Sequence, residues 1–115
     1  VTVYGVDLKD EIVSKALSLT KTYLGYFEGY FGIKYTLPKL DIVTTSRFVF
    51  GGMEHWGAIV LRNYDLEPDV KEGGTILAHE VIHQWLGNLA TNFWWSAIWI
   101  QEAPTYYLAS LVSSK

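Results

Sequence analysis

The chain has 115 residues and a mass of 13.1 kDa, the size of one small domain. Its net charge is −3 and its lysines and arginines are scattered singly, so no basic stripe exists that would neutralise nucleic-acid phosphates. Because it has no cysteines, disulfides and thiolate ligands are excluded, and any metal must bind histidine and carboxylate. The longest nearly apolar run, residues 93–100, is far shorter than the roughly 20 residues that span a bilayer.

The composition is apolar for a domain of this size. Half of the residues are hydrophobic and 18% are charged, whereas about 25% are charged in a typical soluble domain. Such a surface is typical of a segment that neighbouring protein covers, and the first residue is valine rather than methionine. We therefore expect residues 1–115 to be a single segment of a larger protein, without an internal domain boundary, whose remaining domains are its partners. No feature of the sequence indicates a compartment.

One amphipathic helix is predicted to dominate the N-terminal third. Residues 1–6 alternate as in a strand or a linker. Asp7 is a good N-cap residue, and Gly32 can end a helix in the left-handed conformation. Between them the apolar residues recur every three or four positions, which marks one face of a helix, namely Ile12, Ala16, Leu19, Tyr23, Phe27 and Tyr30.

Short strands are predicted in the middle of the chain. Residues 40–45 are β-branched and follow Pro38, and residues 58–62 form a second β-rich run. The glycine pair at 51–52 breaks the pattern between them. Two such runs predict neighbouring strands, with antiparallel pairing as one possibility. The polar stretch 63–74 predicts a loop.

Two further helices are predicted, over residues 75–86 and 101–112, the first ending near Gly87 and Asn88. Short mixed strands followed by helices indicate an α+β fold.

The first of these helices carries the sequence His79-Glu80-Val81-Ile82-His83. Residues four apart lie one turn above each other, so both imidazoles can bind one metal ion. Glu80, on the flank of that face, can reach a water at the metal without being a ligand, which suits a catalytic base. The same pentapeptide also arises by chance in proteins without a metal.

A third ligand is therefore needed, and Glu102 is the candidate. It follows His83 after residues 84–101, at the start of the next predicted helix. A helix, a loop and an antiparallel helix would return its carboxylate to the two histidines. Taken alone, a glutamate in this position is more often a solvated acid at a helix start than a metal ligand.

Three stretches together resemble the signatures of the gluzincin aminopeptidases, the aminopeptidase N-like family that includes leukotriene hydrolase. Residues 79–88, HEVIHQWLGN, resemble HExxHxWxGN. Trp94-Trp95 followed by Gln101-Glu102 resembles WWxxxWLNEG. Residues 51–57, GGMEHWG, resemble the exopeptidase motif GxMENWG. The resemblance covers nearly the whole chain.

The resemblance implies part of a thermolysin-like zinc metallopeptidase catalytic domain, with short mixed strands and zinc-bearing helices. One Zn²⁺ per chain would bind His79, His83 and Glu102, and Glu80 would be the general base. The substrates would be peptides with a free N-terminus.

The upstream motif would contribute the substrate-binding residues. Glu54 would bind the substrate α-amine, because a fixed carboxylate in a dry pocket selects an ammonium group. Backbone groups at Gly51 and Gly52 would line the substrate like an added strand.

The sequence departs from the family pattern near these residues. His55 replaces asparagine, Gln101 replaces asparagine, and Ala103 replaces glycine. His55 is also a conceivable metal ligand, although its motif position argues against this. Pro104 is tolerable in the first helical turn and disruptive deeper in the helix.

Three alternatives stay open. The first is a catalytically weakened, zinc-binding relative that recognises peptide termini. The second is the epoxide-opening branch, which shares Gly-Gly-Met-Glu, although Trp56 and Gly57 look more like the plain aminopeptidases. The third is an inactive fragment, because the family's oxyanion-stabilising tyrosine lies well downstream of the third ligand. Tyr106 and Tyr107 lie too close to Glu102 for that role and are predicted to pack the helix.

Overall fold

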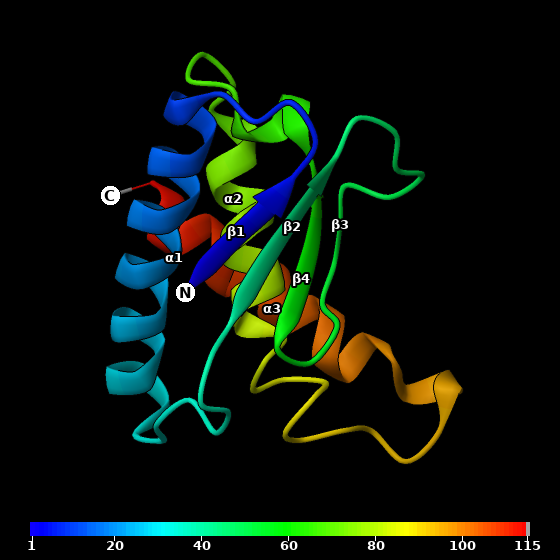
Figure 1. Cartoon of the computed structure of the whole chain (residues 1–115). Coiled ribbons are helices and arrows are strands. Elements are labelled where there is room, and N and C mark those ends of the chain that lie inside the picture. Colours follow the sequence, from blue (N-terminus) through cyan, green and yellow to red (C-terminus); the bar gives the residue numbers. More distant parts are fainter. Residues whose placement is uncertain (115) are drawn as a thin grey trace.

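The computed structural model describes residues 1–114, which form a four-stranded sheet and three α-helices (Figure 1). Two short 3-10 helices lie at Asn63–Leu66 and Trp95–Ala97. The other elements, in chain order, are β1 (Thr2–Gly5), α1 (Asp10–Phe31), β2 (Asp41–Thr45), β3 (Gly52–Met53), β4 (Ala58–Arg62), α2 (Glu72–Ile82) and α3 (Trp99–Ser113). The α+β class predicted from the sequence is confirmed.

The sheet has the strand order β1-β2-β4-β3 and is mixed. β1 pairs with β2 in parallel, and α1 makes the crossover between them. β2 and β4 are neighbours, as predicted, but they run parallel, so the antiparallel option is wrong. The reason is β3, which the sequence analysis treated as a break. The chain changes direction before β3 and again between β3 and β4. β3 therefore pairs with β4 in the antiparallel sense, and β4 runs in the same direction as β2.

Helix α1 lies along one side of the molecule (Figure 1). Its predicted face is buried or half-buried from Ile12 to Phe27, but the prediction is wrong at Tyr30, which is 57% exposed. Its end at Gly32 is confirmed, because this residue has a φ of 66° in the left-handed region. The N-cap prediction is wrong. Asp7 has a φ of 53° in the turn after β1, and the helix begins at Asp10, after Lys9. Aspartate tolerates the left-handed region better than most residues, which suits Asp7 to this turn.

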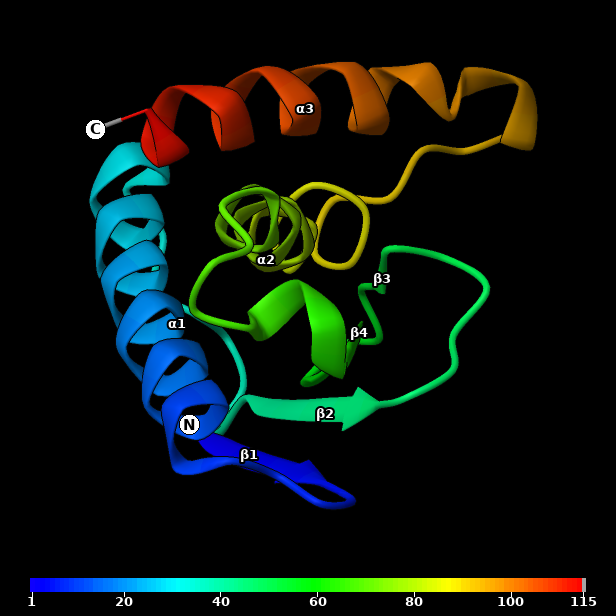
Figure 2. The same cartoon turned by 90° about the horizontal axis from the view of Figure 1, so that it is seen from above.

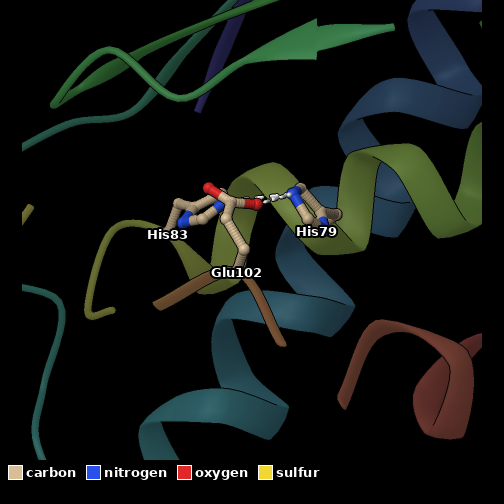
Figure 3. Close-up of side chains that lie close together, drawn as sticks. All are labelled: His79, His83 and Glu102. Atoms are coloured by element: carbon tan, nitrogen blue, oxygen red, sulfur yellow. Dashed lines mark hydrogen bonds and ion pairs between the residues drawn. The ribbon is translucent and has the colours of Figure 1, made fainter. Parts of the chain in front are cut away.

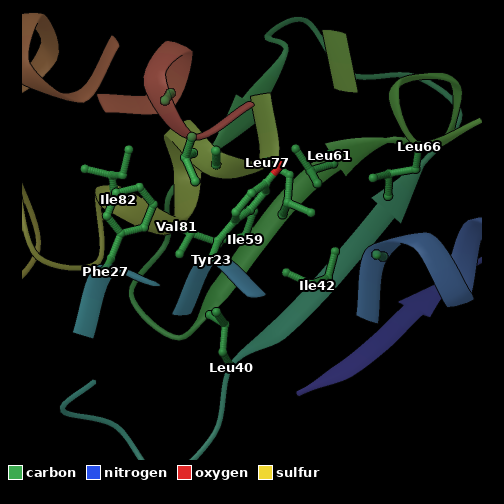
Figure 4. Packing of buried hydrophobic residues seen from close by; sticks show 14 of the residues in the cluster. Tyr23, Phe27, Leu40, Ile42, Ile59, Leu61, Leu66, Leu77, Val81 and Ile82 are labelled. Carbon is green, nitrogen blue, oxygen red and sulfur yellow. The ribbon is translucent and has the colours of Figure 1, made fainter. Parts of the chain in front are cut away.

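Helix α2 lies between the sheet and α3, with α1 beside it (Figure 2). In Figure 4 its side chains meet those of β4 and α1 in one continuous core. Because α2 is covered on several sides, most of its residues are apolar and fully buried, including Leu77, Ala78, Val81 and Ile82. Two of the three metal-ligand candidates, His79 and the C-cap residue His83, therefore belong to a helix that is enclosed on several sides.

The ends of α2 differ from the prediction of 75–86. It begins at Glu72, because the pair Gly73-Gly74 is helical rather than a loop, and it ends at Ile82. His83 follows as the C-cap, and its N–H still bonds the His79 carbonyl at 3.2 Å. The i, i+4 geometry of the two histidines therefore persists.

Helix α3 includes the predicted residues 101–112 but does not run antiparallel to α2. In Figure 2, α2 is seen end-on while α3 crosses it from side to side, so that expectation is wrong. Pro104 lies beyond the first turn, yet the helix continues through it. Proline leaves the Ile100 carbonyl without its helical partner, and Ile100 is exposed, so water can bond that carbonyl. None of the helices in residues 1–114 is long and apolar enough to cross a membrane.

Candidate metal centre

His79, His83 and Glu102 converge where α3 crosses α2 (Figure 3). The Nε2 atoms of the two histidines are 2.9 Å apart. Each Nε2 lies 3.4 Å from one oxygen of the Glu102 carboxylate. One ligand atom from each residue falls within 4.8 Å of the others, and no further histidine or carboxylate of the described chain joins this group. The structure thus brings together the three residues that the sequence predicted as ligands.

The turn after α2 fixes the ring of His83. Its Nδ1 lies 2.8 Å from the Leu86 carbonyl oxygen, which can only accept a hydrogen bond. Nδ1 is therefore protonated, and Nε2 presents a lone pair toward His79 and Glu102. Gly87, with a φ of 119°, allows the chain to turn back at this point. A histidine held in this way is prepared to bind a metal through Nε2.

The donor set fits a divalent metal ion. Two imidazoles and one carboxylate form the protein ligand set of a catalytic site that leaves a position open. Burial, and next the neighbouring His83, lower the pKa of His79 to about 4, which favours the neutral imidazole that binds metals. The carboxylates of Glu54, Glu80 and Glu102 line the same cavity, and a cation there would offset their negative charge.

Glu80 lies beside these three ligand candidates but is not among them. It is 5% exposed and lines the cavity together with His79 and Glu102. Burial raises the pKa of its carboxyl group to about 8, and the charges of Glu54 and Glu102 add to the rise. A carboxyl group with a strong tendency to take up a proton is suited to general-base chemistry.

The cavity has a volume of about 350 Å³ and extends from Glu54 past the ligands to the start of α2. Gly51, Gly52 and Glu54 line one side of it, as the resemblance implied. β3 is the edge strand of the sheet, so its outer backbone has no strand neighbour among the described residues. An extended peptide can pair with such an edge.

Gly52 is in close contact with Glu80. A Cβ atom at this position would lie 2.6 Å from the Glu80 Cγ and Cδ atoms, closer than real contacts allow. Gly51 has room for a methyl group, since its nearest neighbours would be side-chain atoms of Ile76 at 3.7 and 3.8 Å. The second glycine therefore lets the β3 backbone approach the Glu80 carboxylate.

His55 is exposed and does not belong to the ligand group, which agrees with its exclusion on motif grounds. The prediction for Tyr106 and Tyr107 is wrong, because they are 67% and 63% exposed. Tyr106 lines the cavity instead, and its ring centroid lies 4.4 Å from that of His79. Tyr106 lies four residues, about one helical turn, after Glu102, and this spacing is the sequence signal that could have predicted its place near the ligand candidates.

Two polar residues of the 79–88 stretch also have a role that sequence reasoning missed. The Gln84 side chain accepts a hydrogen bond from the Gly57 N–H at 3.0 Å. The Asn88 side chain donates to the Glu54 carbonyl at 2.7 Å. The signal was the presence of amide side chains in a run otherwise rich in buried apolar residues. Their contacts lie in the segment that carries Glu54.

Comparison with known proteins agrees with this geometry. Residues 15–115 match the Peptidase family M1 domain. Human glutamyl aminopeptidase is 38% identical over 88% of this chain, and bovine endoplasmic reticulum aminopeptidase 2 is 39% identical over 94%. Probable aminopeptidase 2 of Sulfurisphaera tokodaii is 41% identical over 82%. The chain spans only 11%, 12% and 13% of these three relatives, in that order. The chain belongs to peptidase family M1.

Proposed function

We propose that this chain carries the centre of a zinc-dependent aminopeptidase, within part of a thermolysin-like catalytic domain. The observation that supports this most directly is a single cavity that holds the three ligand candidates, a buried glutamate beside them and a second glutamate near the sheet edge. The family match and the aminopeptidase relatives support the same assignment.

His79, His83 and Glu102 would hold the ion, and Glu54 would bind the substrate amine. Bound zinc supplies Lewis-acid polarisation of the scissile carbonyl and makes water more acidic. Glu80 takes the proton from the attacking water and returns it to the leaving amine, so the peptide bond is hydrolysed without net proton uptake. The outer edge of β3 aligns the peptide backbone next to these groups.

The test is the release of N-terminal residues from short peptides by the complete protein and by its Glu80→Gln variant. Removing the base is expected to lower kcat by at least about 100-fold while zinc content stays the same. Glu72→Gln is the matched control, because Glu72 is an exposed glutamate in the first turn of the same helix. It should keep full activity.

Two outcomes would contradict the proposal. Full peptidase activity in Glu80→Gln would refute the role of the base. Peptide binding without turnover in the unaltered protein would instead identify the catalytically weakened relative that the substitutions at His55, Gln101 and Ala103 suggested.

A further inference from the structure

Two side chains that follow the end of α2 form hydrogen bonds with the segment that carries Glu54. Gln84 Nε2 donates to the Glu54 carbonyl at 3.3 Å, and Asn88 Nδ2 donates to the same oxygen at 2.7 Å. Gln84 Oε1 accepts from the Gly57 N–H at 3.0 Å. The backbone is therefore held at both ends of residues 54–57.

These amides are firmly placed themselves. Gln84 is 1% exposed, and its Nε2 also donates to the Glu80 carbonyl at 3.3 Å. Both of its donors and its acceptor are thus in use. The backbone N–H of Asn88 bonds the His83 carbonyl at 3.1 Å. The two positions are joined directly to the base and to a metal-ligand candidate.

The backbone of residues 54–57 is also restrained by its own conformation and by the sheet. A hydrogen bond of 2.9 Å from the Ala58 N–H to the His55 carbonyl closes a turn, in which Gly57 has a φ of 85°. On its other side Glu54 follows β3, which pairs with β4. No described residue donates a hydrogen bond to the Glu54 carboxylate, so the backbone sets where this group lies.

The restraint on the backbone of residues 54–57 matters for the position of the Glu54 carboxylate. The Glu54 carboxylate faces the same cavity as the carboxylates of Glu80 and Glu102, and like charges there repel each other. A loose segment would let Glu54 swing away toward solvent, and the ammonium of a substrate would then lose its preorganised partner.

We propose that Gln84 and Asn88 are positioning residues, which fix the distance between the amine-binding Glu54 and the metal ligands. This inference rests on the proposed function, in which Glu54 binds the substrate amine. The same helix end then sets both the metal site and the place where a peptide must begin.

The experiment uses the complete protein in a Glu80→Gln background, so that binding is measured without turnover. Calorimetry gives the dissociation constants of trialanine and of N-acetyl-trialanine, and their ratio reports preference for a free amine. Asn88→Ala is expected to lower this preference roughly three- to tenfold, and Gln84→Met likewise. Zinc content should be unchanged. Asn63→Ala is the matched control, because its amide bonds the remote Val6 carbonyl at 3.4 Å.

A double-mutant cycle separates positioning from general destabilisation. With Glu54→Ala present, Asn88→Ala should change neither dissociation constant further. An unchanged amine preference in both Asn88→Ala and Gln84→Met would overturn the inference. So would an equal loss of affinity for both peptides in either background. If the Glu80→Gln protein itself shows no preference for the free amine, the proposed role of Glu54 fails, and this inference fails with it.

Discussion

Glu80 and Gly52 are in contact, and the lack of a side chain at Gly52 leaves space for the Glu80 carboxyl group. The Glu80 carboxyl group is buried, and a Cβ atom at residue 52 would overlap it. An alanine there must push aside either the carboxylate or the edge strand. The contact thus links β3 directly to α2, the helix that carries His79.

We therefore expect Gly52→Ala to lower kcat roughly 10- to 100-fold, because a displaced catalytic group loses its alignment with the reacting atoms. Gly51→Ala is the matched comparison and should lose much less, since its methyl group meets only Ile76 at ordinary contact distance. Steady-state kinetics with one peptide substrate, together with zinc content, measure both. Equal losses in the two variants would show that the contact with Glu80 does not matter.

At this scale the sequence predicted which three ligand candidates come together, but it did not predict the contacts that support them. The histidine spacing and Glu102 followed from helix periodicity and from the family motifs. The hydrogen bonds of Gln84 and Asn88 to residues 54–57 could not be predicted in this way, because they join segments about thirty positions apart. Local patterns carry no information about such pairings.

Among the elements, α2 depends on glycines at its start. Gly73 is buried where α2 meets the 3-10 helix Asn63–Leu66, and a Cβ atom there would overlap the backbone carbonyl of Asp65. The loop prediction for residues 63–74 failed at this point. A glycine pair is typical of a turn, but here tertiary packing requires it inside a helix.

Gly73→Ala is expected to destabilise the fold by about 2 kcal/mol or more, because backbone rather than a flexible side chain must move. Gly25→Ala supplies the opposite case. This glycine lies inside α1 with open space around it, so alanine should stabilise the fold by about 0.5 to 1 kcal/mol through helix propensity. Urea unfolding of both variants measures the change in the free energy of unfolding and so tests the sign of each prediction. A neutral Gly73→Ala would contradict the packing seen at the start of α2.

The predicted element order was largely right, and its errors have identifiable causes. Apolar periodicity located α1 because one side of that helix is covered. It could not reveal the two-residue strand β3, which has no periodicity of its own. Missing β3 left the direction of β4 relative to β2 undetermined. The crossing of α3 over α2 depends on packing between distant segments and has no local signal.

The whole molecule leaves much apolar surface uncovered. Aromatic side chains are exposed from the loop after α2 to the first residue of α3, at fractions of 87%, 68%, 84% and 66% for Phe93, Trp94, Trp95 and Trp99. Surfaces of this kind are typical of contact with other protein. The apolar composition had led to the same expectation, and the related aminopeptidases are about eight to nine times longer than the matched region, which is 13% and 11% of their lengths. The cavity itself is nevertheless lined by residues from the range 50–106.

Zinc content, measured on the protein and on two histidine variants, tests the central claim most directly. The chain has three histidines, and His55 is the one outside the ligand group, so His55→Ala is a matched control for His83→Ala. We predict about one zinc per chain in the unaltered protein and in His55→Ala, and loss of zinc in His83→Ala, because two ligands hold the ion far more weakly than three. Retention of zinc by His83→Ala, or its absence from the unaltered protein, would contradict the assignment of His79, His83 and Glu102 as the metal site.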